Sequence, residues 1–162
     1  MFYSKSFGIA FVILSTLFFT SGLFAQEDVL KKRKDFMTAR YDELKAIKRA
    51  VEEKDYATIS LRAKDIMGAM DKAVNHFPKG SFSEKSRAKA EIWEKWDQFS
   101  KIPLKVKDVA SALANAAGAK DEAGVQAQFK ALGPESPFRS GACYECHKDF
   151  RSSPPPTKKA GG

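Results

Sequence analysis

The chain has 162 residues, of which 43% are hydrophobic and 30% are charged, and its net charge is +8. Much of the charge lies in mixed runs such as residues 40–55, RYDELKAIKRAVEEKD, which are typical of solvated helix faces. A positive charge is compatible with nucleic-acid binding, but an export signal at the N-terminus argues against that partner. In an exported protein, the positive charge favours a basic surface that attracts an acidic redox protein or a membrane surface.

A short apolar segment opens the chain. The run from Phe7 to Phe19 has 13 residues, Lys5 precedes it, and a small residue, Ala25, follows. A membrane-spanning helix needs roughly 20 residues, whereas this pattern is typical of a secretory signal peptide. We therefore predict a signal peptide at residues 1–25, export to the periplasm, and a mature chain of 137 residues without a membrane span. An uncleaved membrane anchor is the alternative.

The first half of the mature chain has helical periodicity. Glycine and proline are almost absent between Asp28 and Asn75. We expect a first helix from its N-cap Asp28 to about Glu53, and a second helix from the N-cap Asp55 to the loop at residues 78–86. The apolar stripe of the first helix contains Leu30, Met37, Leu44 and Val51, with Arg33, Tyr41 and Ile47 beside them. The second stripe contains Ile59, Ala63, Ile66, Met67, Met70, Val74 and Phe77.

Two further helices are predicted in the second half. Pro103 should interrupt the third helix, because proline removes a backbone donor and crowds the preceding turn. Asp121 begins a fourth helical segment, which stops at GPESP and resumes around the cysteines. No strand pattern is present, so we predict an all-α fold, an antiparallel four-helix bundle over residues 26–152, with a disordered tail at 153–162. The heavier apolar residues of the third helix are Trp93, Trp96, Phe99, Val106, Val109 and Leu113.

Both cysteines lie in the segment GACYECHKDFR near the C-terminus. Cys143, Cys146 and His147 form C-x-x-C-H, the attachment signature of a c-type haem. Two thiols one helical turn apart can add to the two vinyl groups on one edge of the ring, and the adjacent imidazole then points towards the iron. Covalent attachment also keeps the cofactor in an exported protein. The sequence therefore predicts one covalently attached haem c.

Three alternative roles for the two cysteines are less well supported. A disulfide between them would close a very small loop and contribute little stability. A thiol oxidoreductase motif belongs beside a strand in a βαβ unit, and no strand is predicted. A zinc site would need further ligands at matching spacing, and His76 is the only other histidine.

The second axial position on the iron needs a ligand from upstream, because no methionine, histidine or cysteine follows His147. Met37 lies on the core stripe, one turn after Arg33 on the same face. Burying an unpaired guanidinium is expensive, and a haem propionate would supply its counter-charge. The other candidates fit core packing or a partly exposed helix end: Met67, Met70 and His76.

Three segments together resemble the cytochrome c-prime family, the class II c-type cytochromes. ACYECHKDFR is similar to the family ending C-x-x-C-H-x-x-[FY]-R, VLKKRKDFM resembles its first-helix pattern, and AEIWEKWDQF resembles a segment of its third helix. The resemblance implies a bundle with the haem between helices near one end, with His147 as proximal ligand and Met37 at the distal position. It also implies that Arg33 and Arg151 lie near the propionates or the proximal pocket edge, and Trp93 in the core near the haem. The segment GPESPFRSG departs from the more continuous last helix of the family.

The resemblance leaves two functions open. Members with a methionine ligand carry electrons, whereas five-coordinate members bind nitric oxide or carbon monoxide. We favour a one-electron carrier with His147 and Met37 as iron ligands, because methionine is a competent axial ligand that raises the reduction potential. A gas-binding cytochrome is the alternative, and a haem-free thiol oxidoreductase is a third. No cluster of base and nucleophile is recognisable, so no enzymatic activity is expected. Acidic redox proteins are the expected partners, and the resemblance implies a homodimer through the first two helices.

Overall fold

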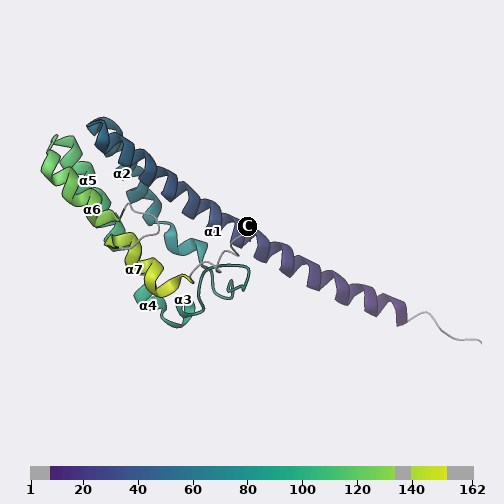
Figure 1. Ribbon diagram of the computed structural model, residues 1–162. Helices are drawn as coiled ribbons and strands as arrows, with labels where there is room; N and C mark the ends of the chain where they lie inside the picture. Colours follow the sequence, from purple (N-terminus) through teal and green to yellow (C-terminus); the bar gives the residue numbers. More distant parts are fainter. Residues whose placement is uncertain (1–7, 134–139, 153–162) are drawn as a thin grey trace, which may run out of the picture.

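The computed structural model describes residues 8–133 and 140–152, and for residues 8–25 it describes the backbone alone. Helices account for all the regular elements of these ranges, and an isolated bridge is their only β pairing. The main helices lie lengthwise against one another (Figure 1), with α2 packed on α1 and α5, and α5 packed on α6 and α7. The prediction of an all-α helical bundle is confirmed. The elements are α1 (Gly8–Glu52), α2 (Tyr56–Met70), the 3-10 helix η1 (Ala73–His76), α3 (Glu91–Glu94), α4 (Trp96–Phe99), α5 (Ile102–Gly118), α6 (Glu122–Leu132) and α7 (Gly141–Phe150).

Two of the three predicted N-caps are present. The Asp55 carboxylate accepts a hydrogen bond from the Thr58 amide at 3.0 Å and begins α2, and Asp121 begins α6 in the same way. The prediction for Asp28 is wrong. The residues directly before it contain no helix breaker, so α1 runs through this position, and the Asp28 carboxylate instead pairs with Lys32 one turn later at 2.5 Å.

The predicted third helix is divided into three pieces. Lys95 separates α3 from α4, and α5 begins at Ile102, directly before Pro103. In the first turn of a helix the missing proline N–H leaves no intrahelical bond unmade. Pro103 therefore lies in the first turn of α5. The predicted interruption of the third helix falls just before this residue.

The buried side chains form two clusters. The first, which we call the helix core, fills the space between α1, α2, α5 and α6 and contains Ile47, Ile59 and Leu113, all fully buried. The second, which we call the aromatic cluster, consists of buried Phe77, Ile92, Phe99 and Phe150, with half-buried Met37, Val74, Ala88, Trp93, Ile102 and Cys146 packed against them.

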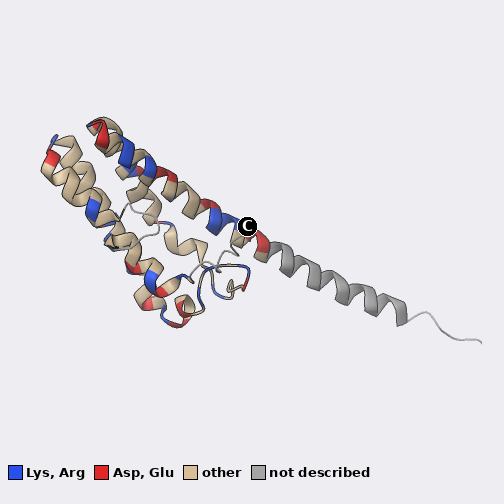
Figure 2. Cartoon of the chain, in the orientation of Figure 1, with Lys and Arg blue, Asp and Glu red and all other residues tan. Residues whose placement is uncertain are grey.

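Lys and Arg are interspersed with Asp and Glu along α1 (Figure 2), as the mixed run at residues 40–55 predicts. One member of the predicted stripe of α1 differs: the Tyr41 ring is exposed, and the Lys45 ammonium lies 4.9 Å from its centroid. Over the residues that the structure describes, no helix is long and apolar enough to cross a lipid bilayer. The predicted tail at 153–162, and residues 1–7 of the predicted signal peptide, lie outside the described residues.

Candidate functional site

The C-x-x-C-H motif lies on α7. Gly141, at a φ of 80°, turns the chain into this helix, and after Phe150 the backbone becomes extended at Arg151. Residues three and four positions apart share a helix face. The side chains of Cys143, Cys146 and His147 therefore project from one side of α7, and all three are half-buried.

The helix α7 links the two buried clusters. Cys143 packs against the helix core, whereas Cys146 packs against the aromatic cluster, to which α7 also contributes the buried Phe150. Met37, from α1, packs against the same aromatic cluster. The fold therefore brings the thioether of Met37 and the thiol of Cys146 to one cluster, although more than a hundred residues separate them in the chain.

Burial determines the protonation of the three side chains of the motif. It raises the pKa of the Cys143 thiol to about 11, and burial together with the neighbouring Cys143 and Asp149 raises the pKa of Cys146 to about 12. Burial, with the positive charges of Arg151 and Arg87, lowers the pKa of His147 to about 4. At neutral pH the thiols are protonated and the imidazole is neutral, which is the form that binds a metal through a ring nitrogen.

Arg33 is buried, with 5% of its surface exposed, and oxygen atoms surround its guanidinium. Its Nε donates to the His76 carbonyl at 2.9 Å, Nη2 donates to the Ser81 hydroxyl at 2.7 Å and the Ser81 carbonyl at 3.3 Å, and Nη1 donates to the Ser86 hydroxyl at 3.3 Å. Burial lowers the pKa of Arg33 from its ordinary value. The sequence reasoning missed these partners, although the serines of the loop at 78–86 were a signal for them.

Trp93 holds the other side of the same loop. Its indole N–H donates to the Phe77 carbonyl at 3.2 Å and to the Pro78 carbonyl at 2.9 Å. The Arg33 guanidinium carbon lies 4.5 Å from the Phe77 ring centroid and 5.5 Å from that of Trp93, within the range of a cation–π contact. Arg33 and Trp93 thus fix this loop at the end of the bundle where Met37 lies.

The remaining predicted side chains lie in different places. Arg151 follows α7 and pairs with Ala88 in the isolated antiparallel bridge, and burial, then the charge of Arg87, lowers its pKa. His76 is half-buried, and its ring stacks on Phe36 at a centroid distance of 4.3 Å. Met67 and Met70 pack against the helix core, which is the packing role expected for them.

These residues fit a c-type haem. The two thiols and the imidazole share one face of α7, and the aromatic cluster beside Cys146 offers the apolar surroundings that a porphyrin requires. A thioether, Met37, lies in that cluster on another helix. Within the described part of the chain, histidine, cysteine, aspartate and glutamate side chains form no group of three or more that could hold a metal ion.

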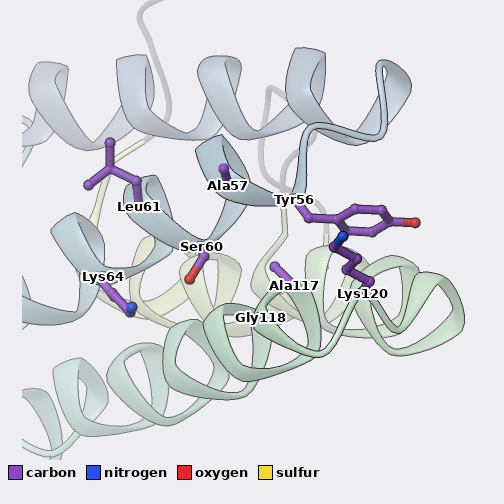
Figure 3. A pocket seen from close by; sticks show the side chains of 8 residues that line it. All are labelled: Tyr56, Ala57, Ser60, Leu61, Lys64, Ala117, Gly118 and Lys120. Carbon is purple, nitrogen blue, oxygen red and sulfur yellow. The ribbon is translucent and has the colours of Figure 1, made fainter.

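A separate hollow lies at the other end of the bundle, between α2 and α5 (Figure 3). Its volume is about 410 Å³, and no residue predicted for the site lines it. It is lined by Tyr56, Ala57, Ser60, Leu61, Lys64, Ala117, Gly118 and Lys120.

Comparison with known proteins supports a covalently attached c-type haem as the cofactor. Residues 28–151 match the family described as Cytochrome C'. Cytochrome c' of Rhodospirillum rubrum is 34% identical over 124 residues, which cover 74% of this chain and 79% of that protein. Cytochrome c' of Pararhodospirillum photometricum is also 34% identical, covering 77% of this chain and 97% of that protein.

Solved structures of cytochrome c prime from Alcaligenes xylosoxidans share the fold. The recombinant native protein superimposes with a TM-score of 0.67 at 21% identity, covering 79% of this chain and 97% of that chain. A nitric oxide complex of a mutant of the same protein gives a TM-score of 0.67 at 22% identity, covering 80% and 97%. At this level of identity, the comparison supports the four-helix bundle fold.

Proposed function

The chain belongs to the cytochrome c' family, and we propose that it carries single electrons through a haem whose iron is bound by His147 and Met37. The family binds a covalently attached c-type haem, so the protein is a c-type haem protein. When bound, the haem supplies the one-electron chemistry. The residues of the chain attach it, provide its axial ligands and exclude water from it.

The observation that carries this proposal is that Met37 and Cys146 pack in one aromatic cluster. Cys143 and Cys146 would hold the haem from α7 by two thioether bonds, with the neutral imidazole of His147 on one side of the ring. Met37 packs against the same aromatic cluster from α1, so its thioether would be available as the second ligand to the iron of a haem held there. A methionine ligand favours ferrous iron and raises the reduction potential, as an electron carrier requires.

Arg33 and Arg151 are proposed to lie near the propionates or the proximal edge of the haem. Within the described residues, four of the five guanidinium N–H groups of Arg33 donate to the oxygens of His76, Ser81 and Ser86. The second N–H of Nη1 remains for a propionate oxygen. Trp93, held by two carbonyl oxygens, would form part of the apolar wall.

We also propose a periplasmic location and an acidic redox partner. The first 25 residues have the pattern of a signal peptide, and the rest of the chain carries 27 basic and 20 acidic residues, a net charge of +7. A positive net charge increases the rate of encounter with an acidic protein at low ionic strength.

Gas binding is the second candidate function. It is favoured by the solved nitric oxide complex of a mutant cytochrome c prime with the same fold. Here Met37 would shield the distal side of the ring without binding the iron. The two functions differ in the ligation of the iron, which a spectrum reports directly.

The test compares the optical spectra of ferric and ferrous protein, with and without carbon monoxide, in wild type, Met37→Ala and Met67→Ala. Met67 is the matched control, because it is also a half-buried methionine but packs in the helix core. We expect low-spin wild type and Met67→Ala, and a high-spin, carbon-monoxide-accessible Met37→Ala that keeps its haem. If the wild-type protein is already high-spin and binds carbon monoxide at once, the electron-carrier proposal is wrong and the gas-binding function takes its place.

A further inference from the structure

A short antiparallel pairing ties the end of α7 to the loop before α3. The Ser152 amide donates to the Arg87 carbonyl at 2.8 Å, and the Lys89 amide donates to the Phe150 carbonyl at 3.1 Å, on either side of the bridge between Ala88 and Arg151. We call residues 87–89 and 149–152 together the C-terminal bridge. It is the point at which the chain leaving α7 is fixed to the rest of the bundle.

Side chains reinforce the C-terminal bridge. The Arg87 guanidinium donates two hydrogen bonds to the Ser152 carbonyl, from Nε at 2.9 Å and from Nη2 at 2.5 Å. The Ser152 hydroxyl donates to the Arg87 carbonyl at 3.3 Å, and the Lys89 ammonium donates to the Asp149 carbonyl at 2.9 Å. Arg87 therefore contacts the end of α7 through both its backbone and its side chain.

The C-terminal bridge lies close to the proposed proximal ligand, His147. Ser152 follows His147 by five residues, so the bridge holds the turn of α7 that directly follows the proximal ligand. A helix end without such a contact frays, because its last carbonyl groups have no intrahelical partner.

Resting on the proposed function, we propose that Arg87 is a positioning residue for the proximal ligand. Its guanidinium holds the Ser152 carbonyl, and through it the last turn of α7, so that the imidazole of His147 keeps one orientation towards the iron. Because the C-terminal bridge directly follows the turn that carries His147, the charge of Arg87 would act on a haem bound there, and a positive charge near the iron would disfavour the ferric state. Loss of Arg87 should therefore lower the reduction potential and loosen the proximal helix.

The test uses the haem-bound protein and three variants. Arg87→Gln removes the charge and the paired donors, and Arg87→Lys keeps the charge. Lys148→Gln removes a charge from an exposed side chain next to His147, outside the C-terminal bridge, and is the matched control. The measurements are the reduction potential, the electron paramagnetic resonance spectrum of the ferric haem, and hydrogen exchange of the Ser152 and Lys89 amides.

We expect Arg87→Gln to lower the potential more than Lys148→Gln does, and to broaden the ferric resonance signals. Exchange of the Ser152 amide should become about fivefold faster, the scale of one lost hydrogen bond. Arg87→Lys should return the potential towards the wild-type value. The proposal is overturned if Arg87→Gln and Lys148→Gln behave alike in all three measurements. It is also overturned if the potential falls while the amide exchange and the resonance signals stay unchanged, because charge alone then explains the effect.

Failure of the proposed function would be separately visible. If replacing His147 by Ala leaves the ferric haem spectrum unchanged, the assignment of the proximal ligand is wrong. If that replacement changes the spectrum but Arg87→Gln matches Lys148→Gln, His147 is the ligand and only the role of Arg87 is rejected.

Discussion

The guanidinium of Arg33 on α1 donates hydrogen bonds to both the hydroxyl and the carbonyl oxygen of Ser81, which lies 48 residues later in the chain. Ser81 is itself buried, and its hydroxyl donates to the Pro78 carbonyl at 2.7 Å. This pair joins the first helix to the loop that closes the end of the bundle beside Met37. The Ser81 oxygens satisfy N–H groups of the buried Arg33 guanidinium, and a haem propionate could be a further partner.

Arg33→Leu should destabilise the protein. The substitution leaves the buried oxygens of Ser81 and His76 without their donor, and losses of this kind cost about 3 kcal/mol in free energy of unfolding. Chemical denaturation of the haem-bound protein measures the effect, with Arg49→Leu as the control, since Arg49 is exposed on the same helix. If a propionate is also a partner, the reduction potential should change in Arg33→Leu alone. An unchanged denaturation midpoint would contradict the structural role.

The haem should depend on both cysteines for its covalent attachment. Cys143→Ser or Cys146→Ser should each leave a haem held by one thioether, and the double replacement should yield mostly haem-free protein, because no other thiol exists in the chain. Extraction with acidified organic solvent, followed by the absorbance of the protein fraction, measures what stays attached. Haem retained by the double variant after this extraction would show that the attachment site lies elsewhere.

The stability of the haem-bound protein should depend on pH through His76. Burial, and then the charges of Arg33 and Arg40, hold the pKa of His76 below its ordinary value of 6.5. The unfolded chain therefore binds more protons than the folded one below about this pH, so the contribution of His76 to stability is lost as pH falls from 6.5. Denaturation at pH 5 and pH 7 should give a larger difference for wild type than for His76→Gln. Equal differences in the two proteins would exclude His76 as the source.

The junction between α6 and α7 should not tolerate a side chain at Gly133. This residue ends α6 at a φ of 87°, and a Cβ atom there would lie 2.3 Å from the Ser140 carbonyl oxygen. Gly133→Ala should lower the free energy of unfolding by about 1–3 kcal/mol. Gly68→Ala is the control: Gly68 lies inside α2 with nothing within 4 Å of its Cβ position, so alanine should stabilise this helix by up to about 1 kcal/mol. The opposite order of the two unfolding temperatures would refute this account of the junction.

The sequence determined the helical class, the caps at Asp55 and Asp121, and the haem motif. Each of these depends on residues within a few positions of one another, where helical periodicity and side-chain chemistry act directly. The same local reasoning failed at Asp28, because a good N-cap residue begins a helix only when the preceding residues leave the helix, and here they continue it. It also placed Tyr41 on the buried stripe, although this residue faces solvent.

The tertiary structure alone decided which distant segments meet at the site. Nothing in the sequence pairs Arg33 with Ser81 or Ala88 with Arg151, whereas the family resemblance already implied that Met37 lies near the haem motif. These contacts join residues that are far apart in the chain, and they depend on how the helices pack and where the loop at 78–90 crosses their ends. Periodicity assigns a face to each helix, but the partner of that face is fixed only when the apolar surfaces of all the helices are buried together.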